Sequence, residues 1–411
     1  MTIKQPVSTS RSKSGQDDKR KKAIKIEYPS YSVCQLIQVC LFSIFFLSCA
    51  FLKLPRELTE KAGTWQMYGK DAGHGSSSHI MSDSLERIWD NDVGAGFGDF
   101  SPTIADGIVY IGTLNGEIHA LDVSTGKELA SKNFGGAIFS GPAISDSIMV
   151  VSSSQSKENI FAYDIYSGKI IWSKRIADVE SSPAVFRKQI YVATLKGDLY
   201  KLDLQTGEEI FHDSFDAPIR TSSAIVDSLC VFGCDDGNVR AVNTASGKVE
   251  WKYDAGSPVW CSASMSGTDV PGKDSSIFVG TNAGRLLALS REGKLRFDFN
   301  TGEKILSMPI YDERRVYFGC DDGDFYALDI HSGALLWKVH TDAPIVASAS
   351  QTENQIFFGS FDKNLYVVNK SDGKMEQRIN LSGRVRTQPA IFENYLVVGA
   401  EDSEIFGFLI K

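Results

Sequence analysis

The chain has 411 residues and a formal net charge of −8; 42% of its residues are hydrophobic and 23% are charged. Its first 27 residues hold eight of the 43 basic side chains and three of the 51 acidic ones, so the rest of the chain has a net charge near −13. Because such an acidic surface repels phosphate backbones, we do not expect nucleic acid as a partner.

The N-terminal segment has the order of a bacterial export signal. Eight Lys or Arg within residues 1–26 precede an apolar run over residues 33–47, and Ser48 and Cys49 follow. A basic region, an apolar region and a small residue before a cysteine predict a lipoprotein signal, with the lipid on Cys49. The lipobox usually has leucine at the position of Phe46 and a small residue at that of Leu47, so the match is imperfect.

An uncleaved membrane anchor is the alternative interpretation of this segment. Extended to Leu52, the apolar run reaches about 20 residues, just enough to span a bilayer, although Gln35 and Gln38 weaken this interpretation. The basic residues ahead of the run leave the rest of the chain outside the cytoplasm in either case. We therefore divide the chain into a basic leader with an apolar export signal (1–48), a charged tether (49–64) and a folded domain (65–411).

The folded domain is a repeat array. One landmark, the residue pair that closes a strand in each unit, recurs after 42, 39, 40, 47, 39 and 40 residues. Apolar residues alternate at period two within the units, and units of about 40–45 residues with four strands are typical of propeller blades. The landmark pairs are Leu121-Asp122, Tyr163-Asp164, Leu202-Asp203, Val242-Asn243, Leu289-Ser290, Leu328-Asp329 and Val368-Asn369.

The two ends of the array complement each other. Leu85–Trp89 has the pattern of an outer strand without a blade of its own, because its tryptophan recurs at the same place in other units. Gln388–Leu409 supplies inner strands, but the chain stops before an outer one. Pairing these segments would close the ring and remove exposed sheet edges. We therefore predict an all-β fold, an eight-bladed β-propeller of four-stranded antiparallel blades, with seven blades as the alternative count.

The cysteines and acidic turns of the domain do not indicate a metal site. Cys234 and Cys320 fill a strand-end position that holds Thr or Ser in other units, so we expect small buried thiols there. The spacing of Cys230 and Cys234 lacks His or Cys companions, and the Asp-Gly turns lack the closing glutamate of a calcium loop. Cys261 is the remaining cysteine of the domain.

The units resemble the PQQ-type repeat of quinoprotein propellers. Val109-Tyr110-Ile111-Gly112, Ala120-Leu121-Asp122 and Thr125-Gly126 carry the resemblance. Within that superfamily the chain resembles the BamB family of lipoproteins, which belong to the machinery that inserts β-barrels into bacterial outer membranes. The lipoprotein-like leader, a chain that is almost only propeller, and Trp65-Gln66-Met67-Tyr68 support this. The resemblance implies a periplasmic, non-catalytic scaffold without cofactor, anchored to the outer membrane; an inner-membrane anchor is the alternative.

The loops from each outer strand to the next inner strand cross one face of the disc, and we expect the partner there. Arg220, Trp260, Arg384 and Arg386 stand out in these loops, and both residue types are enriched in binding hot spots. Arg220 resembles the arginine with which BamB proteins engage their partner, which implies a BamA-like assembly subunit. The next loop, Ser257-Pro258-Val259-Trp260, departs from the acidic loop of that family. Solvated or internally paired arginines are the alternative.

Two other functions compete with the scaffold. One is an extracytoplasmic protein that binds a solute or glycan at the channel mouth, with Trp260 and Phe139 as stacking surfaces. The other is a PQQ-dependent dehydrogenase. Those enzymes resemble this chain in their repeats, but they carry a vicinal cysteine pair and a calcium-binding carboxylate on inner strands. This chain has no Cys-Cys and offers Ser, Pro and Ala instead, so we predict no catalytic, cofactor or metal residues.

Overall fold

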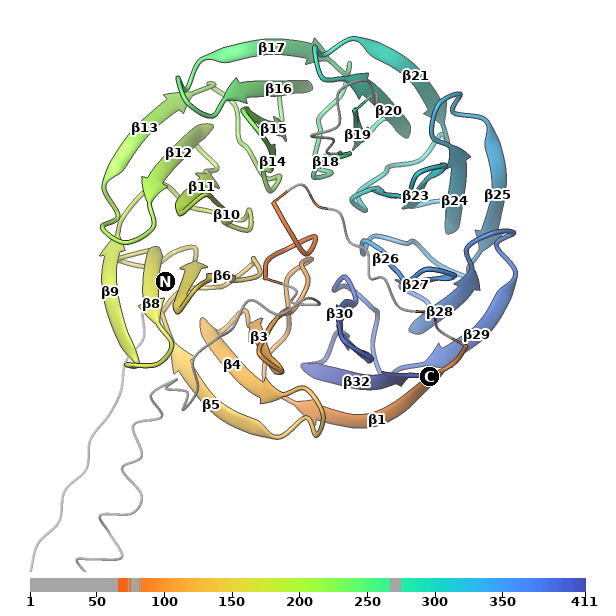
Figure 1. Ribbon diagram of the computed structural model, residues 1–411, viewed down its shortest axis with the longest axis horizontal. Coiled ribbons are helices and arrows are strands. Elements are labelled where there is room, and N and C mark those ends of the chain that lie inside the picture. The colour runs from red at the N-terminus through yellow and green to blue at the C-terminus, as the bar shows by residue number, and fades with distance from the viewer. Residues whose placement is uncertain (1–65, 73, 75–80, 82, 267–274) are drawn as a thin grey trace, which may run out of the picture. The chain divides into compact units, whose positions relative to one another are not determined.

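The computed structural model describes residues 66–72, 74, 81, 83–266 and 275–411. Within these residues, 32 strands form eight four-stranded antiparallel sheets around a central axis (Figure 1). The predicted eight-bladed propeller is confirmed, and the alternative count of seven is wrong. The predicted leader (1–48) and the whole predicted tether (49–64), which includes Cys49, lie outside the described residues. No helix of the described part is long and apolar enough to cross a bilayer.

Blades 1 to 7 each consist of four consecutive strands, from the axis outward. Blade 1 contains β2 (Thr103–Ala105), β3 (Ile108–Gly112), β4 (Glu117–Asp122) and β5 (Glu128–Asn133), and blade 2 contains β6 (Ala143–Ser145), β7 (Ile148–Ser152), β8 (Ile160–Asp164) and β9 (Lys169–Lys174). Blade 3 contains β10 (Ala184–Phe186), β11 (Gln189–Ala193), β12 (Asp198–Asp203) and β13 (Glu209–Ser214), and blade 4 contains β14 (Ala224–Val226), β15 (Leu229–Gly233), β16 (Asn238–Asn243) and β17 (Val249–Asp254). Blade 5 contains β18 (Ser264–Met265), β19 (Ser276–Gly280), β20 (Arg285–Ser290) and β21 (Leu295–Asn300), and blade 6 contains β22 (Ile310–Tyr311), β23 (Arg315–Gly319), β24 (Asp324–Asp329) and β25 (Leu335–His340). Blade 7 contains β26 (Ser350–Gln351), β27 (Gln355–Gly359), β28 (Asn364–Asn369) and β29 (Met375–Asn380).

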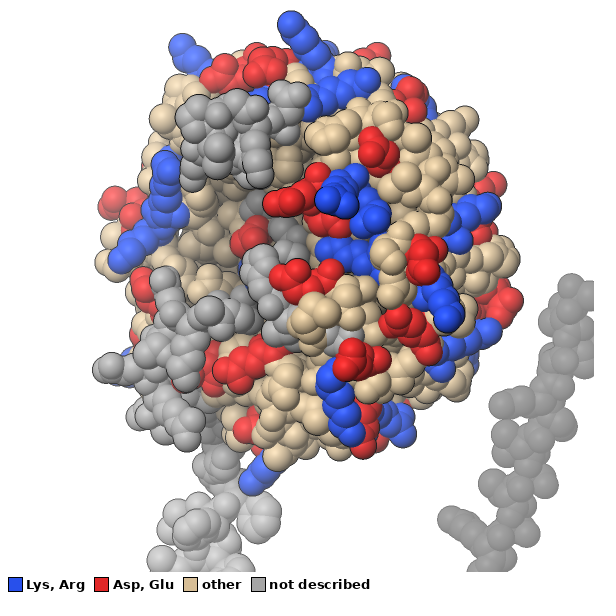
Figure 2. Space-filling view, turned by 45° about the vertical axis from the view of Figure 1, so that its right-hand side comes forward, with Lys and Arg blue, Asp and Glu red and all other residues tan. Residues whose placement is uncertain are grey.

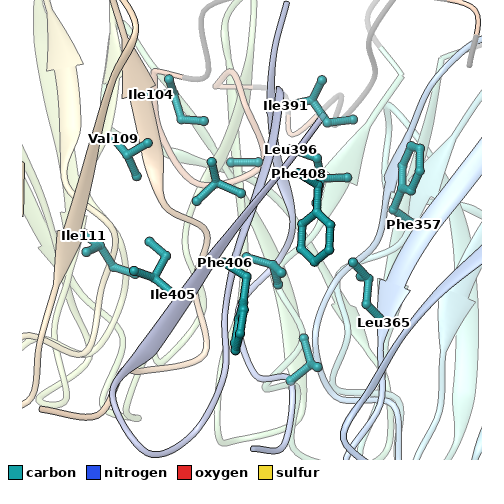
Figure 3. Close-up of a cluster of buried hydrophobic side chains, with 14 of the residues drawn as sticks. Ile104, Val109, Ile111, Phe357, Leu365, Ile391, Leu396, Ile405, Phe406 and Phe408 are labelled. Atoms are coloured by element: carbon teal, nitrogen blue, oxygen red, sulfur yellow. The ribbon is translucent and has the colours of Figure 1, made fainter. Parts of the chain in front are cut away.

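Blade 8 closes the ring from both ends of the domain. It consists of β30 (Ala390–Phe392), β31 (Tyr395–Gly399) and β32 (Glu404–Ile410), and its outer strand is β1 (Leu85–Asp92). β1 pairs antiparallel with β32, with Trp89 opposite Gly407, as predicted from the orphan strand. The apolar side chains at this closure come from blades 7, 8 and 1 and form one buried cluster (Figure 3). The two chain ends are therefore joined by a core as well as by backbone hydrogen bonds.

Position within the blade decides how the strands are patterned. The second strand of each blade, such as β11, is buried along nearly its whole length, because neighbouring blades cover both of its faces. The outer strand β13 is largely exposed, with half-buried residues in alternation. The repeat sequence reflects this difference: its second strands are short apolar runs, and its outer strands alternate between exposed and half-buried residues.

Neighbouring blades are joined by an aromatic ring placed on a turn glycine. The Trp89 ring lies on Gly126 of blade 1, whose φ is +69° and where a Cβ would come within 2.5 Å of the indole. The Trp89 Nε1 donates to the Val123 carbonyl at 2.8 Å. Glycine is needed there for both the left-handed backbone and the close approach. The same contact joins Trp172 to Gly207, Phe211 to Gly247, Trp251 to Gly293, Phe297 to Gly333 and Trp337 to Gly373.

Around the axis, hydroxyl groups link successive inner strands. The backbone N–H of Ser182 donates to the Ser222 Oγ, and that of Ser222 donates to the Ser262 Oγ, both at 2.9 Å. We call the eight equivalent residues of this level the collar. They are Ser101, Gly141, Ser182, Ser222, Ser262, Met308, Ser348 and Gln388.

A segment ahead of the first blade crosses the axis. We call its described residues, 66–72 and 74, the plug, and the red-orange end of the chain lies inside the ring in Figure 1. The Gln66 and Ala72 carbonyls accept from the Ile144 and Ile225 N–H groups of blades 2 and 4. The Tyr68 hydroxyl pairs with the Ser348 Oγ at 3.0 Å, and the His74 Nδ1 lies 2.7 Å from the Ala263 carbonyl. The plug is thus hydrogen-bonded to inner strands on several sides of the channel.

The four cysteines of the described residues are free and buried. Burial raises the pKa of Cys230, Cys234, Cys261 and Cys320 to about 12. Each thiol is therefore protonated and unreactive at neutral pH. This agrees with the prediction of small structural thiols at strand ends.

Candidate functional site at the channel mouth

The strands of each blade alternate in direction, so their connections fall on two faces of the disc. The loop from each outer strand to the next inner strand, and the hairpin between the second and third strands, share one face, which we call the mouth face. The residue two positions before each collar residue forms the mouth ring on this face. The mouth ring consists of Asp99, Phe139, Glu180, Arg220, Trp260, Leu306, Val346 and Arg386.

A cavity of about 230 Å³ opens between these residues. Every member of the mouth ring except Arg386 lines it, and its floor contains Tyr68 of the plug together with Ser182, Ser222 and Ser262 of the collar. Tyr68 of the plug therefore helps to form the floor of a cavity that opens on this face. The mouth ring holds two acidic and two basic residues, so its charges sum to zero, and Trp260, Leu306 and Val346 form an apolar arc between the two arginines.

Arg220 is held by neighbours from three blades. Its Nη1 donates to Glu180 at 2.7 Å, and its Nε donates to Asp235 at 3.2 Å. The Trp260 Nε1 donates to the same Asp235 at 2.8 Å, and the guanidinium lies 5.8 Å from the Trp260 ring centroid. Desolvation lowers the pKa of Arg220, but its hydrogen bonds to Glu180 and Asp235 outweigh this and raise it. The cluster fixes both an arginine and a tryptophan at the edge of the cavity.

Arg386 occupies the same repeat position in blade 8 and has a similar set of neighbours. It donates to Glu401 and to Asp99, both at 2.8 Å, and lies 5.1 Å from the ring of Phe361. Arg384 shares Glu401 at 3.6 Å and lies over the same Phe361 ring. The predicted partner residues thus fall into two clusters, Arg220 with Trp260 and Arg384 with Arg386. The arginines of both clusters are internally paired.

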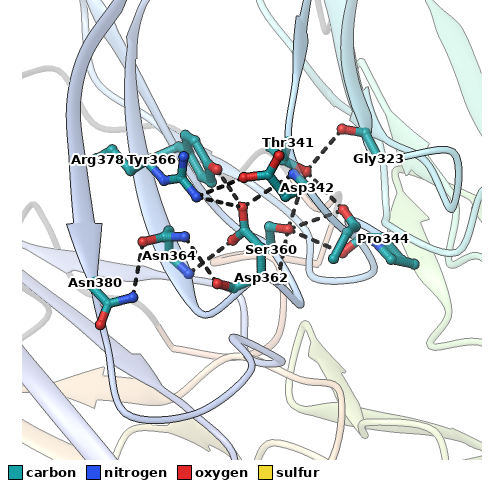
Figure 4. A network of polar contacts seen from close by, with 11 residues as sticks. Gly323, Thr341, Asp342, Pro344, Ser360, Asp362, Asn364, Tyr366, Arg378 and Asn380 are labelled. Carbon is teal, nitrogen blue, oxygen red and sulfur yellow. Dashed lines mark hydrogen bonds and ion pairs between the residues drawn. The ribbon is translucent and has the colours of Figure 1, made fainter.

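The loops that carry the mouth ring are fixed by side-chain hydrogen bonds. Between blades 6 and 7, the Thr341 hydroxyl donates to the Gly323 carbonyl at 2.9 Å and pairs with the Ser360 hydroxyl at 3.1 Å (Figure 4). Arg378 then joins Asp342 at 2.9 Å, which ties the loop to the outer strand. The mouth is therefore a preformed surface, and side chains placed on it lose little freedom on binding.

Comparison with known proteins identifies the family. The family model described as "Outer membrane protein assembly factor BamB" matches residues 82–228, 156–259 and 235–359, which together span more than half of the chain. The chain belongs to the BamB family. Among its curated relatives, BamB of Burkholderia pseudomallei is 23% identical over 270 residues, covering 62% of this chain and 69% of the relative. BamB of Escherichia coli K12 is 25% identical over 272 residues, covering 61% and 69%.

Solved structures show the same fold. The BamB structure from Moraxella catarrhalis has a TM-score of 0.65 at 17% identity and covers 80% of this chain and 100% of that one. The quinohemoprotein alcohol dehydrogenase from Comamonas testosteroni has a TM-score of 0.72 at 14% identity and covers 84% and 80%. At these identities the likeness concerns the propeller alone.

The residues at the axis do not fit the quinone and calcium ion of such dehydrogenases. The plug lies across the channel, with Tyr68 and His74 buried in it. The arginines at the mouth are already paired with carboxylates, which opposes binding of an anionic quinone. The described residues contain no group of three His, Cys, Asp or Glu side chains that could hold a metal ion.

Two features of the site were not predicted from the sequence. The plug was expected only as the start of the propeller, and its contacts with the inner strands have no counterpart in the repeat. The pairing of Arg220 did have a signal, because Glu180 precedes it by 40 residues, one blade, at the same repeat position. Aligning the loop ends of successive units would have placed these charges side by side.

Proposed function

We propose that this chain is a non-catalytic scaffold of outer-membrane protein assembly. It lies outside the cytoplasm, anchored to the outer membrane by a lipid on Cys49, and contacts a BamA-like β-barrel assembly subunit through its mouth face. Membership of the BamB family supports the assembly role, and the lipoprotein-like leader supports the location. The misfit between the axis and a quinone cofactor favours the scaffold over a dehydrogenase.

The observation that carries the contact surface is the cluster of Arg220, Trp260, Glu180 and Asp235. Trp260 is 42% exposed although its Nε1 is bonded to Asp235. The ring therefore offers an exposed apolar surface in a fixed orientation. Fixed tryptophan and arginine side chains at a loop surface are typical of interface hot spots. Elsewhere, on the side shown in Figure 2, Lys and Arg are interspersed with Asp and Glu, which does not favour a phosphate-backbone partner.

The test is partner recovery after mild cross-linking in cells that express variants of the full-length chain. Arg220→Ala and Trp260→Ala should each reduce recovery of the β-barrel assembly subunit by about tenfold or more, since hot-spot truncation costs about 2 kcal/mol or more. Arg291→Ala is the matched control, because Arg291 is also half-buried and paired, with Asp227 at 2.8 Å, but lies in turns of the opposite face. Equal recovery from all three variants would exclude the mouth face as the contact surface.

A further inference from the structure

The wall of the cavity formed by blades 3, 4 and 5 repeats one arrangement three times. Each blade contributes a mouth-ring residue above a collar serine: Glu180 above Ser182, Arg220 above Ser222, and Trp260 above Ser262. Ser348 and Gln388 also line the cavity, but both are bonded to the plug: Tyr68 pairs with Ser348, and the Gly69 N–H donates to Gln388. The three serines therefore face the part of the cavity that the plug leaves open.

These three serines each retain an unused hydroxyl donor. Ser182, Ser222 and Ser262 use their Oγ to accept the N–H of Gly141, Ser182 and Ser222, at 3.1, 2.9 and 2.9 Å. Among the described residues, no acceptor is found for any of their O–H groups. The serines are only 5%, 5% and 7% exposed, so water reaches them only through the cavity. A ligand in the cavity would meet three O–H donors from adjacent blades, and it would have to supply oxygen acceptors.

The charges above the floor favour a neutral ligand. Arg220 is neutralised by Glu180 and Asp235, and Asp99 by Arg386. An anion would be brought against Glu180 and Asp99, and a cation against Arg220, in each case without a free counter-charge at the wall. A purely apolar group would leave the serine donors unpaired, at about 1–3 kcal/mol for each buried donor.

The cavity is also small. A volume of about 230 Å³ lies below the roughly 300–1,000 Å³ of pockets that hold drug-sized ligands, so its occupant is a single ring or side chain. Trp260 adds a fixed aromatic surface on one wall, and the Glu180 carboxylate adds an acceptor on another. A neutral ring that bears several hydroxyl groups and an apolar C–H face meets all of these requirements.

We propose that the mouth cavity binds one neutral saccharide ring, with its oxygens on Ser182, Ser222 and Ser262 and its C–H face against Trp260. This site is additional to the assembly role and does not depend on it. At about −0.3 kcal/mol per non-hydrogen atom, a hexose of roughly twelve such atoms binds with a Kd of a few millimolar. Binding is therefore weak for a single ring, and a sugar could compete with a protein partner for Trp260.

Saturation-transfer NMR on the full-length chain tests the proposal, with glucose, N-acetylglucosamine and the matched anion glucuronate as probes. At least one neutral sugar should bind with a Kd of a few millimolar, while glucuronate should bind at least tenfold more weakly. The saccharide ring can come from a free sugar or from the end of a glycan chain, and tetramers of the same sugars distinguish the two. A site for free sugars binds only the monomers, whereas a site for the terminal ring of a glycan binds both monomers and tetramers. Absence of saturable binding by every neutral sugar, or equal binding of glucose and glucuronate, would overturn the proposal.

Two serine variants locate the site. Ser222→Ala removes one O–H donor and should weaken sugar binding three- to tenfold, as expected for one hydrogen bond of about 0.5–1.5 kcal/mol. Ser348→Ala is the matched control, because Ser348 also accepts a collar N–H, from Met308 at 2.9 Å, but its hydroxyl already pairs with Tyr68. Equal weakening by the two variants would contradict the assignment to blades 3–5. If Ser222→Ala lowers the melting temperature more than Ser348→Ala, Ser262→Ala replaces it.

Discussion

Arg220 and Arg386 occupy the same repeat position in blades 4 and 8, and comparing them shows how one unit is used in two ways. Each arginine is bracketed by a hairpin carboxylate of its own blade, Asp235 or Glu401, and by a mouth-ring carboxylate of a neighbouring blade. Only Arg220 lines the cavity. The same local charge arrangement therefore lies beside the cavity in blade 4 and beside the ring closure in blade 8.

The difference comes from what fills the channel beside each arginine. Next to blade 8, Gln388 receives the Gly69 N–H of the plug and its Nε2 donates to the Ala349 carbonyl at 2.8 Å. Next to blade 4, Ser222 is bonded to its two collar neighbours, Ser182 and Ser262, and to none of the described plug residues. Among the collar residues, the plug is thus bonded to Ser348 and Gln388 of blades 7 and 8, the filled side, whereas Ser182, Ser222 and Ser262 of blades 3–5, the open side, face the cavity. If this division is functional, substitutions on the filled side should mainly lower stability, and substitutions on the open side should mainly weaken binding.

The largest effect is expected at the closure. Trp89→Ala should lower the free energy of unfolding by about 3–5 kcal/mol, because it removes a buried indole from the seam between blades 8 and 1. Trp172→Ala removes the equivalent contact with Gly207 on the open side, but Trp172 is only half-buried and lies within a continuous chain. We expect a smaller loss there. Urea unfolding monitored by circular dichroism measures both.

A loss for Trp172→Ala equal to or larger than that for Trp89→Ala would contradict this view of the closure. It would mean that the aromatic contacts between blades contribute similar free energies of unfolding, so that the contact at the ring closure is not more important than the others. Both variants should keep the far-ultraviolet spectrum of the folded propeller at low urea, which separates loss of stability from failure to fold.

The next effect is a pH dependence from the plug. Burial lowers the pKa of His74, while its hydrogen bond to the Ala263 carbonyl and the nearby Asp71 oppose this in part. The folded chain therefore holds His74 neutral, whereas the unfolded chain takes up a proton near pH 6.5. Stability should be complete above that pH and fall below it, by at most about 1.4 kcal/mol per pH unit. Urea unfolding between pH 8 and pH 5.5 measures the slope.

His74→Gln should be less stable than the parent at pH 8 but should lose less stability on acidification. The control is His212→Gln, which removes a histidine from the exposed perimeter of blade 3 without touching the plug. Parallel curves for the parent and His74→Gln would show that the plug does not respond to this titration.

The closure could be predicted from the sequence because it uses the repeat itself. The tryptophan of the Leu85–Trp89 segment matches the outer-strand tryptophans of other units, and its contact with a turn glycine recurs between blades. The structure extends that strand to Asp92 but keeps its partner, β32. Features of this kind recur in several units, so they can be recognised by comparing the units of one sequence with each other.

The plug could not be predicted in the same way, because each of its contacts occurs once. Tyr68 meets Ser348 across 280 residues and Gly69 meets Gln388 across 319, and neither pair has a periodic counterpart. The serine donors were hidden for a related reason. The sequence offers small residues on inner strands, but only the geometry separates a hydroxyl that is fully used, as in Ser348, from one with a free O–H.

The two arginines should contribute little to stability, and by similar amounts. Both are about one-third exposed, so screening by solvent limits Arg220→Ala and Arg386→Ala to a loss of about 0.5–1 kcal/mol each. Their effects on the cavity should differ, because only Arg220 lines it. Differential scanning calorimetry gives the stabilities, and saccharide titration of the same samples gives the binding. A matching loss of sugar binding in Arg386→Ala would remove the distinction between the open and filled sides.

The smallest effect is expected at Cys261 of blade 5, a thiol at the position where Thr221 of blade 4 and Thr387 of blade 8 carry hydroxyls. Cys261 holds the place that Thr387 holds in blade 8, where the Thr387 hydroxyl accepts the Gly399 N–H at 2.7 Å and donates to the Gly399 carbonyl at 3.2 Å. A serine can make the same pair of bonds with Gly280, so Cys261→Ser should change the free energy of unfolding by less than about 0.5 kcal/mol. Cys261→Val fills the site without a polar atom and should cost about 1–3 kcal/mol, since the Gly280 N–H loses its acceptor. If serine proves as costly as valine, the position depends on the thiol itself, and blade 5 differs here from blades 4 and 8, where Thr221 and Thr387 each bond both backbone groups of the facing glycine.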